Sequence, residues 1–574
     1  MSSIRAALIF LLLGALPAGA ADRYAATTQS LRTHHAPQWY EDAKFGIFIH
    51  WGPYSVPAYH EWYVDFISPK ANYGFLFGTP PYTAERGELP EELFLEKTRS
   101  EAVEYHRKNW GADFPYDGFL PMFRAEKFDP AAWARLFRDA GAQYVVLTAK
   151  HGDEFAMWPS KYTHRNAMET GPKRDVAGDL TTAVRAAGMK MGFYHNTTYT
   201  FWDARYPGRD WVEYMNNSIK ELVDLYHPSV LWGDVLTGPV RDERGRPLPA
   251  DYWGAKQVLA YYYNHSPEPL EVVANDRWGL DYDGKTLGDF ATPERTRMTS
   301  IRKDKWETCD SLDPHSWGYN RSLPISEYMT PNQVVDYLAD VVSKNGNLLI
   351  NIGPRADGTI PEVMAACLRR VGEWLRVNGE AIYGSRYWDV PRDGDVRFTR
   401  KGNVLYAIAL EWPEDPLTLT SLAGKEVLKV EMLGLGEPVK WRQVPEALVI
   451  DPPSGPSKRY GVREDNQPSK RMTIAIRECI AAIDLVHFMV HNIVVKRVNI
   501  HDAKTNLSRY LAELTPGETL VLCNRNQPVA ELRSLRKPGG FRKPRIGAAR
   551  GEFVVPDSFF EPLPDEILKT FSGK

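Results

Sequence analysis

The chain has 574 residues, which exceeds the size of one ordinary hydrophobic core and predicts roughly two to four domains. Hydrophobic residues make up 43% of the sequence and charged residues 25%, which excludes a mainly disordered or membrane-embedded protein. The net charge of −3 excludes a strong overall attraction to nucleic acids or acidic lipids.

Residues 1–20 have the pattern of a secretory signal peptide. Arg5 precedes the apolar run Ala6–Leu16, and the small residues Ala18-Gly19-Ala20-Ala21 follow it. The run suits an export signal and is shorter than the about 20 apolar residues that a membrane anchor needs. We therefore expect cleavage after Ala20 and a secreted or periplasmic protein. No later stretch is long enough to span a bilayer, so we expect no membrane partner.

Residues 21–387 predict an α/β fold of the (β/α)8-like TIM barrel type. A short apolar strand, a polar loop and an amphipathic helix recur along residues 40–390, as in the helix that Asp129 caps and Pro130 begins. In such a barrel the functional residues gather at the carboxyl ends of the strands. The expected strands are Phe45–Ile49, Tyr144–Leu147, Lys190–Tyr194, Val230–Trp232, Glu271–Ala274 and Asn347–Ile350.

Residues 388–455 change to short alternating strands separated by turns rich in Gly and Pro, which predicts a small β-sandwich. The segment Asp451–Ser457 breaks this pattern before a further closing strand has been seen, so the sandwich is possibly truncated. Residues 456–490 are interpreted as a linker or read-through. The expected strands are Val396–Phe398, Val404–Leu410, Leu417–Leu419, Glu426–Met432 and Ala447–Ile450.

Polar side chains follow five of the expected barrel strands. They occur as His50, Lys150-His151, Tyr194-His195, Trp232-Gly233-Asp234 and Asn275-Asp276-Arg277-Trp278. A histidine beside a tryptophan is often only a hydrogen-bonded core residue, but five such strand ends favour a ligand site. Imidazoles, a guanidinium and indoles around carboxylates suit a polyhydroxylated ligand such as a sugar.

The sequence contains no motif that would indicate a cofactor. Its four cysteines match neither a metal site nor a disulfide framework, and there is no Gly-rich phosphate loop, H-E-x-x-H motif or serine nucleophile elbow. A pair of carboxylates remains, and glycosidic cleavage uses two of them, one as nucleophile or base and one as acid. We therefore expect no cofactor and no metal.

These motifs, together with TPE (292–294), WETCDSLDPHSWGYN (306–320) and NGNLLINIGPRADGTIP (345–361), resemble the α-L-fucosidases of glycoside hydrolase family 29. The resemblance extends from about residue 26 to residue 455. It implies a retaining exo-hydrolase that removes terminal α-linked L-fucose from a fucosylated glycan. It also implies a barrel followed by a β-sandwich.

The resemblance assigns roles to individual residues. Asp234 matches the nucleophile and Glu294 matches the acid/base, while Glu307 in the WETC motif is a rival acid whose other interpretation is a structural salt-bridge partner. The positions that match fucose-binding residues are His50, Glu61, Trp62, His151, Tyr194, Trp232 and Arg277.

One departure from the pattern of the family bears on fucose binding. The pattern K-H-H-[DE]-G-F is replaced by KHGDEF at residues 150–155, so Gly152 stands where the second His is usual. This departure removes a hydrogen-bond donor to a fucose hydroxyl. Its three interpretations are weaker fucose binding, a preference for a related sugar, and a local sequence error. A binding-only descendant without activity is the alternative function. We expect an imidazole at position 152 to restore a contact with fucose.

Residues 491–574 resemble a different family. The stretch 498–514 predicts a helix with Asn499 as its cap, and Thr519–Cys523 and Val529–Leu532 predict a hairpin, with IVVKR (493–497) as a possible first strand. This unit and the ending FFEPLPDEILKTF are similar to prevent-host-death (Phd/YefM) antitoxins. The resemblance implies self-pairing, operator DNA and a toxin as partners. The other interpretation is an accessory domain, such as a sugar-binding one.

An export signal and a DNA-binding module belong to different compartments. We therefore interpret the chain as two coding regions joined between about residues 455 and 490. Without a closing strand the sandwich would have an open sheet edge, which is unfavourable. A junction after residue 455 would explain why that strand is missing.

Overall fold

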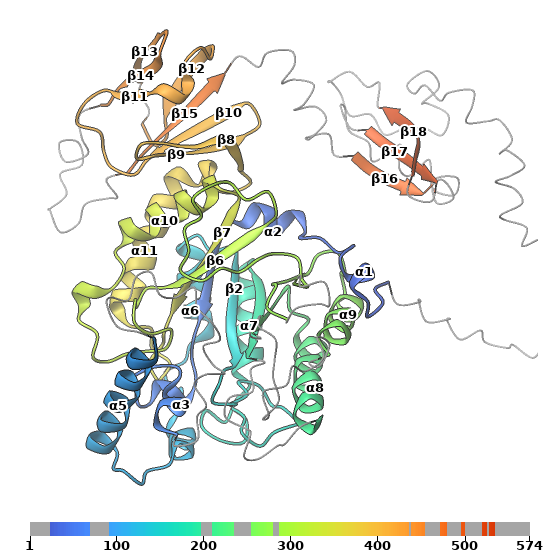
Figure 1. The fold of residues 1–574 in the computed structure, drawn as a ribbon, viewed down its shortest axis with the longest axis vertical. Coiled ribbons are helices and arrows are strands. Elements are labelled where there is room, and N and C mark those ends of the chain that lie inside the picture. Colours follow the sequence, from blue (N-terminus) through green and yellow to red (C-terminus); the bar gives the residue numbers. More distant parts are fainter. Residues whose placement is uncertain are drawn as a thin grey trace, which may run out of the picture. The chain divides into compact units, whose positions relative to one another are not determined.

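The computed structural model describes residues 23–68, 91–196, 209–234, 254–278, 286–435, 438–453, 471–478, 495–499, 519–524 and 527–533. The chain divides into two compact units, Met1–Glu478 and Cys479–Lys574 (Figure 1). The predicted signal peptide, residues 1–20, lies outside the described residues. Within the described part, none of the helices has the length and apolar character needed to cross a bilayer.

A parallel sheet of seven strands forms the centre of the first unit, with strand order β5-β4-β3-β2-β1-β7-β6. Nearly all of its residues are buried, because helices cover one face and the other face turns toward the barrel interior. All six predicted barrel strands are present, and β6 is a strand that the sequence did not predict. The bounds are β1 (Phe45–Ile49), β2 (Tyr144–Lys150), β3 (Lys190–Asn196), β4 (Val230–Asp234), β5 (Val273–Ala274), β6 (Trp306–Ser311) and β7 (Gly346–Ile352).

Residues 290–294 connect the two edge strands of this sheet. Parallel bridges pair Asn275 with Phe290, Ala291 with Trp306, and Glu294 with Cys309. The expected eighth strand is therefore represented by isolated bridges, and this bridging segment carries Glu294 between β5 and β6.

Helices lie around the sheet (Figure 1). The predicted helix α6 begins at Pro130, and the Asp129 carboxylate accepts a hydrogen bond from the Ala132 N–H at 2.9 Å. The α-helices are α1 (Thr28–Leu31), α2 (Gln38–Ala43), α3 (Tyr63–Ile67), α5 (Glu91–Asn109), α6 (Pro130–Asp139), α7 (Val176–Ala186), α8 (Arg209–Tyr226), α9 (Ala255–His265), α10 (Pro331–Ser343) and α11 (Glu362–Asn378). The 3-10 helices are η1 (Pro53–Ser55), η3 (Tyr116–Met122), η4 (Ile325–Glu327), η5 (Gly379–Ala381) and η6 (Thr420–Leu422).

Two antiparallel sheets form the predicted sandwich. Their strand orders are β12-β15-β10-β9-β8 and β11-β14-β13. All five predicted strands are present, whereas β8, β13 and β15 were not predicted. The bounds are β8 (Arg386–Asp393), β9 (Val396–Lys401), β10 (Val404–Ala409), β11 (Leu417–Leu419), β12 (Val427–Met432), β13 (Lys440–Val444), β14 (Ala447–Asp451) and β15 (Met472–Glu478).

The position of β15 corrects two predictions, the truncation of the sandwich at residue 455 and, for residues 472–478, the assignment of 456–490 to a linker. This strand lies between β10 and β12 and is antiparallel to both, so it closes the sheet that was expected to stay open. Met472, Ile474 and Ile476 are buried in the core of the sandwich. Arg471 forms two hydrogen bonds of 2.6 and 2.5 Å with Asp336 of α10, which ties the strand to the barrel.

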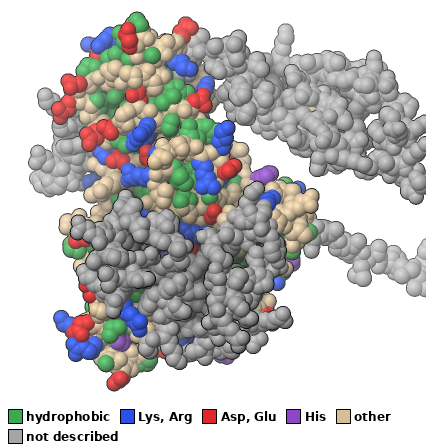
Figure 2. Space-filling model, viewed as in Figure 1, with side chains coloured by type: hydrophobic (Ala, Val, Ile, Leu, Met, Phe, Trp, Pro, Cys, Tyr) green, Lys and Arg blue, Asp and Glu red, His purple; other side chains and the backbone are tan. Residues whose placement is uncertain are grey.

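The surface of the first unit carries charges of both signs. On the face shown in Figure 2, acidic and basic side chains are interspersed over the sandwich and the barrel among the described residues. This distribution agrees with the small net charge of the chain.

The second unit contains a three-stranded sheet of order β16-β17-β18. The strands are β16 (Val495–Asn499), β17 (Thr519–Asn524) and β18 (Gln527–Arg533), and the antiparallel pair β17–β18 confirms the predicted hairpin. β16 runs parallel to β17 and agrees with the possible first strand at 493–497. The predicted helix 498–514 is wrong at its start, because Val498 and Asn499 belong to β16, and its remaining residues lie outside the described ones.

Candidate active site

Two carboxylates share one guanidinium nitrogen at the carboxyl ends of the barrel strands. Asp234 ends β4, Arg277 follows β5, and Glu294 lies on the bridging segment. Nη1 of Arg277 lies 3.0 Å from Oδ1 of Asp234 and 2.5 Å from Oε1 of Glu294. These two oxygens can therefore be no farther apart than the sum of the two distances, 5.5 Å.

Arg277 is fixed by contacts on its other sides. Its Nε and Nη2 donate to the hydroxyl and carbonyl oxygens of Thr292, at 3.1 and 2.8 Å. Its guanidinium carbon lies 4.8 Å from the ring centroid of Trp232, a cation–π distance. Because Arg277 is held so firmly, it sets the positions of both carboxylates.

Asp234 is placed for reaction by opposing electrostatic effects. Burial raises the pKa of its carboxyl, Arg277 opposes this, and Glu294 adds to the increase. The Tyr194 hydroxyl donates to Oδ2 at 2.7 Å, so each oxygen of Asp234 accepts a hydrogen bond. The carboxylate is therefore oriented while its counter-charge is shared with Glu294.

The rival acid Glu307 lies in the barrel interior, where it accepts hydrogen bonds from three donors. Oε2 accepts from the hydroxyls of Tyr40 and Tyr144, and Oε1 accepts from the indole of Trp232 at 3.0 Å. Burial raises the pKa of Glu307 and these donors oppose the increase. The side chain has no exposed area, so Glu307 is structural, although its partners are neutral donors instead of the expected salt bridge.

Two predicted histidines meet at the end of β1 and β2. The ring centroids of His50 and His151 lie 5.5 Å apart, and Nδ1 of His50 lies 2.8 Å from Oδ1 of Asn351. An amide oxygen only accepts, so Nδ1 carries the proton and Nε2 of His50 is left as an acceptor. Burial lowers the pKa of His50 to about 4 and, together with the charge of His50, that of His151 to about 3.

Glu61 lies on the same side of the site as these histidines. Burial would raise its pKa, but His60, His151 and His50 lower it to about 2. Its Oε2 accepts hydrogen bonds from the Trp317 and Gly318 N–H groups at 2.9 and 3.2 Å. The pocket therefore combines a fixed anion with neutral imidazoles, which suits a neutral polyhydroxylated ligand.

The space beside Gly152 is already occupied, which argues against the expected benefit of an imidazole there. A Cβ atom at this position would lie 2.6 Å from Cζ3 of Trp62 and 3.5 Å from Oδ2 of Asp65. The ring of Trp62 also lies edge-on to His151, with centroids 4.7 Å apart. The ring of Trp62 therefore occupies the space that a side chain at position 152 would enter.

The same loop departs from the pattern at Glu154, where K-H-H-[DE]-G-F has glycine. Glu154 has a φ of 60°, in the left-handed region that favours glycine, and its carboxylate pairs with the buried Lys150. This ion pair explains why a glutamate is tolerated there. A comparison of residues 150–155 with the family pattern could have revealed this second departure.

Several of the polar residues at the strand ends form hydrogen bonds within the barrel instead of with the two carboxylates. Nε2 of His195 lies 2.8 Å from the Ser218 hydroxyl of α8, away from the carboxylates. The side chain of Asn275 exchanges two 2.8 Å hydrogen bonds with the backbone of Gly233, and Asp276 accepts from the Thr292 hydroxyl at 2.7 Å. Of the predicted site residues, Asp234, Glu294, Tyr194, Trp232 and Arg277 form one contact network, while His50, Glu61, Trp62 and His151 form an adjoining one.

Trp317 and Asn351 were not among the predicted site residues, although both stand in the quoted motifs. The ring centroid of Trp317 lies 5.2 Å from that of His50, and Asn351 donates to the Trp317 carbonyl at 2.7 Å. Asn351 sits near the end of β7, so the rule of polar strand ends could have found it. Within the described residues, no cluster of three or more His, Cys, Asp and Glu side chains could hold a metal ion.

Comparisons with known proteins agree with this geometry. The family model described as Alpha-L-fucosidase matches residues 12–380, and the Alpha-L-fucosidase C-terminal domain matches residues 392–463. An Alpha-L-fucosidase of Branchiostoma floridae is 35% identical over 447 residues, covering 75% of this chain and 92% of its own. Tissue alpha-L-fucosidase of Homo sapiens is 35% identical over 449 residues, covering 76% and 89%. The crystal structure of Thermotoga maritima alpha-fucosidase in complex with fucose has a TM-score of 0.62 at 35% identity, covering 79% of this chain and all of its own.

Proposed function

The chain belongs to the α-L-fucosidase family, a family of glycoside hydrolases, and we propose that it removes terminal α-linked L-fucose from oligosaccharides or glycoconjugates with retention of configuration. The observation that carries the mechanism is the sharing of Nη1 of Arg277, which keeps one oxygen of Asp234 within 5.5 Å of one oxygen of Glu294. Retaining glycosidases have their two carboxyl groups about 5–5.5 Å apart, whereas inverting ones need a wider gap for water.

In the first step a carboxylate oxygen of Asp234 bonds to the anomeric carbon as the glycosidic C–O bond breaks. Glu294 gives its proton to the leaving oxygen. In the second step the Glu294 carboxylate takes a proton from water, whose oxygen displaces Asp234 from the sugar. Arg277 stabilises whichever of the two groups is an anion, because it contacts both.

The surrounding residues hold the sugar. Glu61 offers a fixed carboxylate to sugar hydroxyls, and His50 and His151 are neutral imidazoles at neutral pH. Trp62, Tyr194, Trp232 and Arg277 complete the predicted binding set. Trp317 adds an aromatic face beside His50.

The test is turnover of a chromogenic α-L-fucoside compared with the corresponding α-galactoside and α-glucoside, with NMR of the first-formed sugar anomer. We expect cleavage of the fucoside and initial release of α-L-fucose. A folded protein that binds fucose but turns over none of these substrates would favour the binding-only alternative. Initial release of the β anomer would contradict the retaining mechanism.

We propose separately that residues 1–20 direct export, and that the 491–574 segment is an antitoxin-like module with no role in hydrolysis. The sheet β16–β17–β18 supports this, since it belongs to its own compact unit and the matches to the two fucosidase family models end at residues 380 and 463, before this sheet begins. Such a module would pair with itself, operator DNA or a toxin only if it were made separately.

The strand β15 narrows the predicted range of the junction, between about residues 455 and 490, to its later part. Because β15 completes the sandwich, we place the junction after Glu478 and not as early as residue 455. Resequencing the locus and mass spectrometry of the exported protein test this placement. An exported species of full length that contains peptides from 498–514 would contradict the hypothesis.

A further inference from the structure

The residue that follows Glu294 has an unusual backbone conformation. Arg295 has a φ of 48°, in the left-handed region that residues other than glycine rarely adopt. Its N–H donates to the Cys309 carbonyl at 2.9 Å, next to the bridge between Glu294 and Cys309. Such a conformation persists only where the surrounding contacts enforce it, and it is frequent at functional positions.

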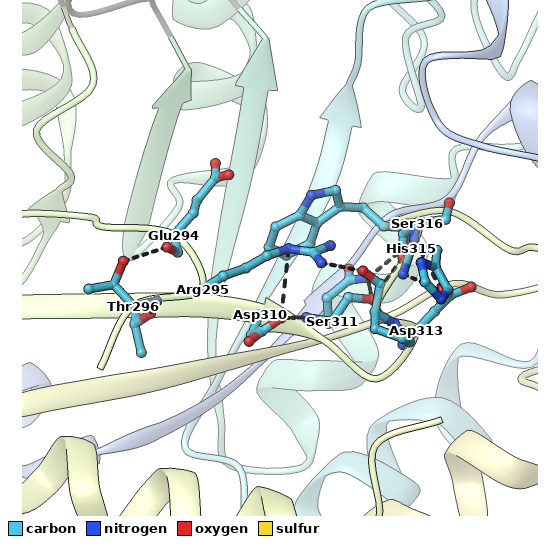
Figure 3. A network of polar contacts seen from close by, with 12 residues as sticks. Glu294, Arg295, Thr296, Asp310, Ser311, Asp313, His315 and Ser316 are labelled. Carbon is cyan, nitrogen blue, oxygen red and sulfur yellow. Dashed lines mark hydrogen bonds and ion pairs between the residues drawn. The ribbon is translucent and has the colours of Figure 1, made fainter. Parts of the chain in front are cut away.

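The side chain of Arg295 provides those contacts. It donates to the Pro314 carbonyl, and its Nε lies 3.8 Å from Oδ1 of Asp310. Its guanidinium carbon lies 5.1 Å from the ring centroid of Trp317. Figure 3 shows Glu294 and Arg295 leaving the backbone in different directions, so one side chain is anchored while its neighbour extends separately.

The anchor of Arg295 belongs to the sugar pocket. Trp317 lies 5.2 Å from His50 between ring centroids, and its N–H donates to Glu61 at 2.9 Å. One planar guanidinium therefore links the bridging segment to the wall of the pocket. Arginine suits this place because its flat face stacks on the indole while its edge donates hydrogen bonds.

We propose that Arg295 is a positioning residue for Glu294, an inference that rests on the proposed role of Glu294 as the acid/base. By tying residue 295 to Trp317 and the Pro314 carbonyl, it fixes the main chain from which the Glu294 carboxyl extends. Its side-chain contacts in the described part of the chain go to Asp310, Pro314 and Trp317, and not to Asp234 or Glu294. Arg295 should therefore matter more for protonation of the leaving group than for recognition of fucose.

The experiment compares the full-length protein with Arg295→Ala and Arg295→Lys on two substrates. A nitrophenyl α-L-fucoside has a leaving group that needs little protonation, whereas methyl α-L-fucoside needs it. We expect Arg295→Ala to lower kcat for the methyl fucoside about 100-fold, at the low end of what general acid catalysis contributes, and that for the nitrophenyl fucoside only a few-fold. Arg295→Lys keeps the charge but loses the planar face, so the same selective loss is expected. The inhibition constant of fucose should rise by no more than a few-fold, far less than kcat for the methyl fucoside falls.

Two reference variants separate the possible outcomes. Arg297→Ala removes an exposed guanidinium that stacks on Tyr337 at 4.6 Å, and it should leave both activities unchanged. Glu294→Ala should show the selective loss in full. If Glu294→Ala is selective and Arg295→Ala lowers both activities equally or neither, the positioning role is wrong. If Glu294→Ala is itself not selective, or the wild type cleaves neither fucoside, the proposed function fails instead.

Discussion

Trp232 contacts two carboxylate environments that differ in what they permit. Over its ring, Arg277 holds Asp234 and Glu294, whose side chains keep 23% and 17% of their area exposed. At its indole nitrogen it donates to Glu307, which has no exposed area. The first environment gives two acids one fixed guanidinium to share and access to a ligand. The second gives one acid three fixed neutral donors and no access, so the same side-chain chemistry becomes structural.

The largest expected effect breaks the first environment. Asp234→Gly should abolish turnover, with a loss beyond the about 10²- to 10⁴-fold that removal of a general acid causes, because no covalent intermediate can form. Azide should partly restore cleavage of a nitrophenyl α-L-fucoside by entering the vacated space, and the fucosyl azide should have inverted configuration. Near-normal activity of Asp234→Gly, measured by the same assay, would show that another residue is the nucleophile.

The second prediction breaks the interior environment. Glu307→Ala leaves the Tyr40 and Tyr144 hydroxyls and the Trp232 indole without their shared acceptor. We expect the free energy of unfolding to fall by about 4 kcal/mol, since each orphaned buried donor costs roughly 1–3 kcal/mol. Urea denaturation measures this loss. Glu307→Gln is the matched control and should cost about half as much, because its amide oxygen still accepts. Loss of turnover in a Glu307→Gln protein that is still folded under the assay conditions would restore Glu307 as a candidate acid.

The third prediction concerns the buried imidazole of His50 in the adjoining network. Burial lowers the pKa of His50 to about 4, below the about 6.5 of an unfolded histidine. As the pH falls from 6.5 toward 4 the unfolded chain takes up a proton that folded His50 refuses, so stability is lost over that window. The difference corresponds to about 3 kcal/mol.

Urea denaturation at several pH values measures this dependence. His50→Gln cannot take up the proton and should remove that share of the pH dependence, although it also shifts the whole curve by altering the bond to Asn351. His315→Gln is the control, since the His315 side chain is 62% exposed. An unchanged slope in His50→Gln would mean that folded His50 is charged in this range.

The sequence predicted the parts of the barrel that depend on local pattern. Parallel strands buried on both faces are continuous apolar runs, and polar residues at their ends stand out against those runs. β6 escaped because Glu307, Thr308 and Asp310 interrupt its apolar character, and the donors that satisfy Glu307 lie far away in the sequence. β15 escaped because its pairing with β10 and β12 spans a stretch without strand pattern.

The sharing of Arg277 between Asp234 and Glu294 could not be predicted for a related reason. Arg277 was predicted to bind fucose, but its bonds to both carboxylates depend on the bridging segment, whose isolated bridges leave no periodic signal. Family pattern could place Asp234 and Glu294 but not their separation. Contacts between distant backbone segments set that separation.

The last prediction sharpens the comparison at the edge of the pocket, where the expected effect is smallest. The family pattern predicts that Gly152→His tightens fucose inhibition, but a Cβ atom at position 152 would lie 2.6 Å from Cζ3 of Trp62. Overpacking of this kind costs about 1–3 kcal/mol, and displacement of Trp62 should weaken inhibition by fucose about tenfold. The matched test is a double-mutant cycle of Gly152→Ala with Trp62→Ala. Gly152→Ala should weaken fucose inhibition in the wild type but have little effect on it once the Trp62 ring is gone. If Gly152→Ala weakens fucose inhibition equally with and without the Trp62 ring, residue 152 affects fucose independently of Trp62. If fucose inhibits Gly152→His more tightly than the wild type, Trp62 moves aside for an imidazole at no cost.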